Sequence, residues 1–194
     1  MRIILYILAF AMLAIIQGPG PQIAFAARDA HQGQATVQAR PLPAPAKPAA
    51  LPGQTVKNAD FSIKLPEGWT LAFPVTKRPD GTSAVFTNDR SQVTVTLNII
   101  KKPLETRQFV DLVLPNMRQS GLNPSKPRNI GNKSMATLNG QAKGEAWFAA
   151  NGKTAVATII LAPKSDIHSA NVFLKAVSSP LRNLIPEAVS TGKP

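Results

Sequence analysis

The chain has 194 residues, enough for one ordinary domain with segments to spare. Cysteine is absent, which excludes disulfide bonds, thiolate metal sites and a cysteine nucleophile, and two histidines are too few for a multi-histidine metal site. Lysine and arginine outnumber acidic residues by 22 to 10, and the net charge of +12 bears on partners rather than on fold.

The N-terminal segment has the three parts of a secretory signal peptide. Arg2 provides the positive charge, residues 3–16 form an uninterrupted apolar run, and a Gly- and Pro-rich break follows. Ala24 and Ala26 then place small residues at the positions that a signal peptidase reads. We therefore predict a signal peptide over residues 1–26, cleaved after Ala26, and a periplasmic or secreted protein. Retention of the segment as an anchor is the alternative.

Residues 27–56 are rich in proline and alanine. Proline fixes φ and lacks an N–H group, so such a stretch supports neither a helix nor a sheet ladder. We predict a disordered tether here that holds a folded domain away from whatever the N-terminus contacts. The alternative is a ligand for an aromatic-lined groove.

Alternating apolar and polar residues predict a strand at 61–65, and turn signals separate it from further strands at 70–75 and 82–87. The clearest strand is 92–100, because its apolar residues all fall on one face. We expect four of its side chains in the core: Val93, Val95, Leu97 and Ile99.

The pattern then changes to helical spacing, which predicts a helix that ends at Gly121. Its expected apolar face consists of Phe109, Leu112, Val113 and Met117. Pro115 conflicts with this helix, because proline inside a helix removes a hydrogen bond and clashes one turn back. We expect either a kink at Pro115 or two helical pieces.

Strands at 145–150 and 153–161 flank Asn151 and Gly152, which are typical of a two-residue hairpin turn. Such a turn would pair Phe148 with Ala155 and Trp147 with Val156. A second helix, capped by Ser165, follows and ends before Pro180. Its apolar positions are Ile167, Ala170, Phe173, Leu174 and Val177.

Strands joined by tight turns pair antiparallel, and the apolar face of a sheet needs a helix against it. The sequence therefore predicts an α+β domain over residues 57–185. We expect an antiparallel sheet of about six strands backed by two main helices. Residues 186–194 are expected to form a flexible C-terminal tail.

Residues 61–69, FSIKLPEGW, resemble the opening strand and turn of the PsbP-like group. This group includes the photosystem extrinsic subunit PsbP, the bacterial DcrB-type envelope proteins and a nuclear Ran-binding factor. The order of elements after this segment is also similar, over about residues 58–180. The resemblance implies binding and assembly rather than catalysis, and no functional residue is carried over from it.

The sequence contains no metal-ligand spacing and no phosphate-binding glycine loop. Ser165, Asp166, His168 and Ser169 are adjacent on one helical turn, and triad groups normally reach each other from separate elements, so a helix cap explains them better. We therefore predict no enzymatic activity, no catalytic residue, no cofactor and no metal. A hydrolase is kept as the least favoured alternative for the function.

Basic residues are densest at 77–78, 101–102 and 126–133. We expect them to dock an acidic envelope protein or an anionic envelope surface. Nucleic acid is not expected, because few aromatic residues lie among them. The candidate binding residues are Lys77, Arg78, Lys101, Lys102, Lys126, Arg128 and Lys133.

Two alternatives to docking stay open: a charge that serves solubility alone, and a periplasmic carrier that holds a small ligand in a pocket between sheet and helices. Trp69, Trp147 and Phe148 could line an apolar binding surface, but we expect at least one of the two tryptophans in the core.

Overall fold

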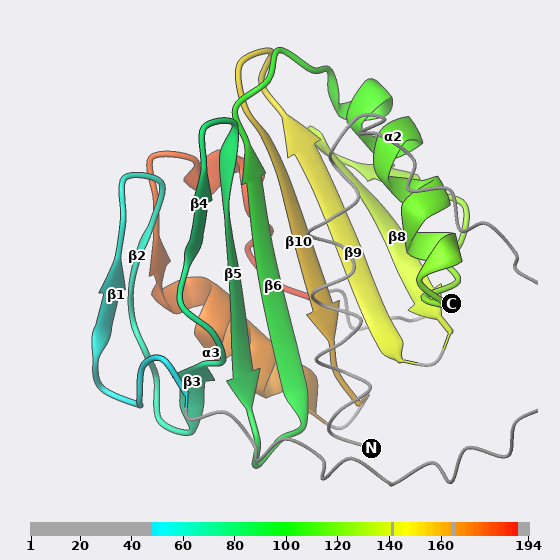
Figure 1. Cartoon of the computed structure of the whole chain (residues 1–194). Helices are drawn as coiled ribbons and strands as arrows, with labels where there is room; N and C mark the ends of the chain where they lie inside the picture. The colour runs from blue at the N-terminus through cyan, green and yellow to red at the C-terminus, as the bar shows by residue number, and fades with distance from the viewer. Residues whose placement is uncertain (1–47, 141, 164–165, 190–194) are drawn as a thin grey trace, which may run out of the picture.

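The structure, a computed structural model, describes residues 48–140, 142–163 and 166–189. Within these ranges, an antiparallel sheet lies between two helices that cover its opposite faces (Figure 1). The α+β class is thus confirmed, with more strands than the six expected. The main sheet has the order β3-β5-β6-β10-β9-β8-β7, and β4 pairs with β5. Its strands are β3 Trp69–Leu71, β4 Thr76–Arg78, β5 Gly81–Asn88, β6 Val93–Ile100, β7 Arg128–Ile130, β8 Lys133–Asn139, β9 Lys143–Ala150 and β10 Ala155–Leu161.

A smaller sheet contains β1 (Thr55–Lys57), β2 (Ser62–Lys64) and β11 (Val177–Ser178). The predicted tether is therefore wrong at its C-terminal end, because β1 begins within it. Pro52 and Gly53 form a turn in which the N–H of Gln54 donates to the carbonyl of Leu51 at 3.2 Å, with Gly53 at φ +81°. Proline here builds a turn rather than an extended spacer. Residues 27–47 and the predicted signal peptide lie outside the described residues.

Helix α3 (Ile167–Ala176) covers one face of the main sheet. The ring centroid of its Phe173 lies 4.4 Å from that of Trp69 and 4.8 Å from that of Phe86, and all three side chains are fully buried. The apolar face of β6 packs into the same core, which confirms the expectation for that strand. Ser165, the expected cap, lies outside the described residues, and Asp166 occupies the N-cap position.

Helix α2 (Thr106–Gln119) covers the opposite face over β8 and β9, where the rings of Phe109 and Phe148 meet edge to face at 6.0 Å. The helix is continuous through Pro115, which excludes two helical pieces, and a kink at Pro115 stays a prediction. Pro115 is exposed, so water can reach the carbonyl that proline leaves unpaired. Leu112, expected on the buried face, is 59% exposed. Gly121 ends the helix as predicted, at φ +75°.

The hairpin between β9 and β10 has a different register from the predicted one. Ala150 pairs with Ala155 and Phe148 pairs with Ala157, which leaves a loop at 151–154. The side-chain oxygen of Asn151 accepts hydrogen bonds from the backbone N–H groups of residues 153 and 154, and of the two central residues only Gly152 has positive φ. A type I′ turn needs positive φ at both. The shift is two residues, so every side chain stays on its expected face.

The chain after α3 is more ordered than expected. A short 3-10 helix, η2 (Arg182–Leu184), is followed by the buried residues Pro186 and Val189. The backbone N–H of Val189 donates to the side-chain oxygen of Asn171 on α3 at 2.7 Å. The expected flexible tail is therefore wrong for residues 186–189, because an apolar residue docks onto α3. The remainder of that tail lies outside the described residues.

Neither α2 nor α3 is long and apolar enough to cross a bilayer, and no other helix in the described ranges is.

The aromatic contact between α3 and the sheet gives a stability prediction. Phe173→Ala should lower the free energy of unfolding by about 3–5 kcal/mol, because it leaves a cavity between Trp69 and Phe86. Urea denaturation measures this change. The control is Val172→Ala on the same helix, whose side chain is 40% exposed and should cost less than about 1 kcal/mol. Equal losses in the two variants would contradict this packing.

Candidate functional site

The turns at one end of the main sheet bring together segments that are distant in the sequence. Gly81 pairs with both Arg78 and Ile100, so β4, β5 and β6 share this end. Ile100 also pairs with Ala155, and Ala155 pairs with Ala150, so the turn between β9 and β10 lies beside them. We call this end, at the top of the sheet in Figure 1, the basic end.

Helix α2 and strand β8 also begin at this end. The hydroxyl of Thr106, the first residue of α2, accepts a hydrogen bond at 3.0 Å from the backbone N–H of Ala150. Lys133 is the first residue of β8. The next residue, Ser134, pairs with Phe148 near the end of β9, so β8 begins at the basic end. The basic end therefore carries these basic residues: Lys77, Arg78, Lys101, Lys102, Arg107, Lys133 and Lys153.

The structure brings some of the seven predicted binding residues together at the basic end and leaves the others apart. Lys77, Arg78, Lys101, Lys102 and Lys133 lie at the basic end. The other two lie farther from this end. Ser125, the residue before Lys126, contacts Thr137, near the far end of β8. Arg128, the first residue of β7, pairs with Met135, two residues after β8 begins. Arg107 and Lys153 were missed because each is isolated in the sequence, and only the fold places them beside the others.

Two of the predicted cations are engaged with carboxylates. The Nζ of Lys101 lies 3.0 Å from the carboxylate of Asp60, which is only 7% exposed, and the Nζ of Lys102 lies 3.6 Å from that of Asp80. By contrast, Lys77, Arg107 and Lys153 are exposed, and no carboxylate of the described residues pairs with them. These three side chains therefore contribute most to the positive electrostatic potential outside the molecule.

Asp60 connects the smaller sheet to the main sheet. Its carboxylate also accepts a hydrogen bond from the hydroxyl of Thr82 on β5. Its backbone N–H donates to the side chain of Asn58 at 2.7 Å, and its carbonyl accepts from the hydroxyl of Ser179, after β11, at 2.6 Å. The ion pair with Lys101 therefore has a structural role, because it completes this junction.

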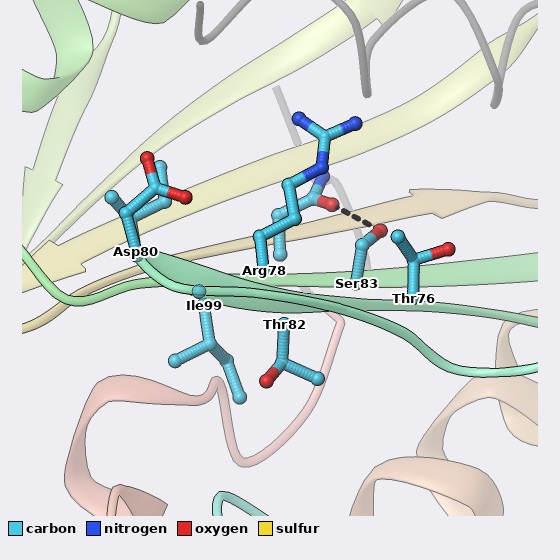
Figure 2. Close-up of a pocket in the computed structure, with 9 residues that line it drawn as sticks. Thr76, Arg78, Asp80, Thr82, Ser83 and Ile99 are labelled. Atoms are coloured by element: carbon cyan, nitrogen blue, oxygen red, sulfur yellow. Dashed lines mark hydrogen bonds between the residues drawn. The ribbon is translucent and has the colours of Figure 1, made fainter.

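A small cavity of about 40 Å³ lies beside the basic end. Figure 2 shows Arg78, Ser83 and Thr76 on one side of the strands, and Thr82 and Ile99 on the other. The hydroxyl of Ser83 donates to the side-chain oxygen of Asn98 on β6 at 2.6 Å. The cavity thus opens on the sheet face opposite α3 and is lined by polar groups of β4, β5 and β6.

A larger groove, of about 540 Å³, runs between the start of α2 and the β7–β8 turn. Arg107 and Asp111 line it from α2, and Asn129 and Lys133 line it from the strands. Its charges are mixed, so it provides no field of one sign.

At least one tryptophan was expected in the core, and both tryptophans and Phe148 are buried. Trp69 and Phe148 are fully buried, and Trp147 is 6% exposed, with its indole N–H donating to the carboxylate of Glu145 at 2.9 Å.

The residues considered for a hydrolase occupy the start of α3. Asp166 is the N-cap residue, His168 is exposed, and the hydroxyl of Ser169 is within hydrogen-bond distance of Asn88 and Ser91. In the described ranges, no three His, Asp or Glu side chains form a group that could hold a metal ion.

No protein-family profile matches the chain, and no curated protein sequence matches it. Among solved structures, the solution structure of cyanobacterial PsbP (CyanoP) from Synechocystis sp. PCC 6803 is similar. The TM-score is 0.41 and the sequence identity is 10%, over 65% of this chain and 91% of that chain. This is a weak similarity of fold. The resemblance to DcrB-type proteins stays a prediction from the sequence.

The junction at Asp60 gives a second stability prediction. Asp60→Ala should lower the free energy of unfolding by about 1–3 kcal/mol, because the hydroxyl of Thr82 loses its acceptor and Lys101 loses its buried partner. The matched control is Asp80→Ala, which removes a pair whose side chains are about half exposed and should cost less than about 1 kcal/mol. Thermal or urea unfolding compares the two. A larger loss for the Asp80 variant would contradict this assignment.

Proposed function

We propose that this protein is an exported, non-catalytic binding protein of the cell envelope that docks an acidic partner through its basic end. One observation carries the proposal: strand pairing gathers cations from separate segments at one end of the sheet. Asp60, Asp80 and Glu105 lie at the same end, so its charge is positive on balance rather than of one sign. An excess of positive charge attracts an acidic partner and orients it during the encounter.

Dissolved salt limits the distance over which the exposed cations attract a partner. Lys77, Arg107 and Lys153 are surrounded by solvent, where ionic screening reduces interactions beyond about 8–10 Å at physiological salt. Binding should therefore weaken as salt rises, and affinity at high salt must come from close contacts.

The alternative function is a small-ligand carrier, which requires an apolar cavity between the sheet and the helices. The small cavity has the charged residues Arg78 and Asp80 in its lining, and the groove beside α2 has Arg107, Asp111 and Lys133 in its lining, next to apolar residues. The core beneath α3 is filled by Phe173 and its aromatic neighbours. These observations favour docking over transport of an apolar ligand.

The test compares two triple variants that remove the same charge. In the first, Lys77, Arg107 and Lys153 are each changed to Gln. In the second, Lys143 at the far end of β9, Lys64 at the end of β2 and Lys175 on α3 are changed in the same way. Binding to an acidic octaglutamate peptide and to phosphatidylglycerol vesicles is measured at low and high salt. The first variant should bind either probe roughly fivefold more weakly than the second at low salt, with a smaller difference at high salt.

The two probes distinguish an acidic protein from an anionic surface as the partner. Equal weakening in the two triple variants would mean that only net charge matters, and the proposal would fail. Wild-type binding that does not change with salt would also contradict it.

A further inference from the structure

The sequence contains two Asn-Gly pairs, at 139–140 and 151–152, and the fold places them at opposite ends of the main sheet. Asn151 lies in the turn at the basic end, whereas Asn139 pairs with Lys143 at the far end of β8. Asparagine before glycine is prone to spontaneous deamidation, because a residue without a side chain leaves its backbone nitrogen open to the neighbouring amide. Both asparagines are exposed, so their hydrogen bonds decide which one reacts.

The turn at the basic end provides a nucleophile and an activated amide. No acceptor among the described residues takes the N–H of Gly152, and a Cβ atom at that position would meet only Glu105 Oε1, at 3.9 Å. The side-chain oxygen of Asn151 accepts from the backbone N–H groups of Lys153 at 3.1 Å and Thr154 at 2.9 Å. Two donors on one carbonyl oxygen stabilise the negative charge that develops there when a nucleophile adds to the carbon.

The backbone nitrogen of the other pair is already engaged. The N–H of Gly140 donates to the carbonyl of Leu122 at 3.1 Å. A Cβ atom at Gly140 would collide with the carbonyl oxygen of Gly121, so the turn after α2 packs directly against this backbone. The nitrogen of Gly140 can attack only after this contact opens, so the native fold protects Asn139.

We propose that Asn151 is a site of spontaneous deamidation in the native protein and that Asn139 is not. The nitrogen of Gly152 gives its proton to hydroxide and bonds to the side-chain carbonyl carbon of Asn151. The bond from that carbon to Nδ2 breaks, and Nδ2 takes a proton from water and leaves as ammonia, which gives a cyclic succinimide. Water then adds to either carbonyl carbon of the ring and opens it to aspartate or isoaspartate. No oxidant or reductant is needed.

The reaction places a carboxylate at the basic end, next to Lys153, where a neutral side chain stood. Aspartate keeps the acceptor for the N–H groups of residues 153 and 154 and so retains the turn, whereas isoaspartate adds a carbon to the main chain and disrupts it. The effect on docking rests on the proposed function: each event makes the basic end less positive and should weaken its attraction for an acidic partner.

The first experiment follows the wild-type protein in isotope-labelled water and locates the incorporated oxygen by peptide mapping and mass spectrometry. In the native protein, Asn151 should react about tenfold or more faster than Asn139. In urea that unfolds the chain, the two rates should converge, because both asparagines precede glycine. Equal native rates, or faster reaction at Asn139, would overturn the assignment. A native preference that persists unchanged in urea would also overturn it, because the local sequence rather than the fold would then select the site.

The second experiment measures docking with two variants that carry the same charge change, Asn151→Asp at the basic end and Asn139→Asp at the far end. Octaglutamate should bind the first about twofold more weakly than the second at low salt. Equal binding, with the native preference for Asn151 intact, would contradict the proposed function of the basic end and leave the modification site standing. Weaker binding of the first variant without that preference would overturn the modification site alone.

Discussion

The pairing register of β6 with β5 and β10 is the constraint on which the rest of the structure depends. Leu97 lies opposite Ala84 and Thr158, and these positions face the core beneath α3. Asn98, one residue later, lies opposite Ser83 and faces the other side of the sheet. A slip of one residue would exchange these faces, placing an amide among aromatic rings and a leucine in the cavity.

The aromatic contact with α3 makes that slip costly. Phe173 packs against Trp69 of β3 and Phe86 of β5, so the position of the helix depends on two strands at once. Aromatic pairs bury large areas and favour particular geometries, which gives this interface more directional preference than aliphatic packing. The same interface that stabilises the fold therefore determines which side chains reach the opposite face, including Asn98 and Ser83.

Local patterns predicted the longer elements, but neither the short strands β1 and β11 nor the site. Alternation identified β6 and its buried face, and helical spacing identified α2 and α3, because burial imposes periods of 2 and 3.6 on a sequence. Turn chemistry was less informative: Asn151 caps its own loop with its side chain, which residue identity alone does not distinguish from a type I′ turn. The basic end depends on pairings between distant segments, so isolated residues such as Arg107 and Lys153 gave no signal in the sequence.

The fold also separates cations that stabilise it from cations that are available to a partner, although all carry the same charge. Lys101 sits against a buried carboxylate that links two sheets, so the removal of its charge would disturb the junction before it altered the outer field. Lys77, next to Arg78 in the sequence, faces the other side of the sheet because strand residues alternate. Long-range electrostatic attraction depends on distance and changes little with the face of the sheet on which a cation lies. A hydrogen bond to a partner, by contrast, can form only on the face where the partner binds.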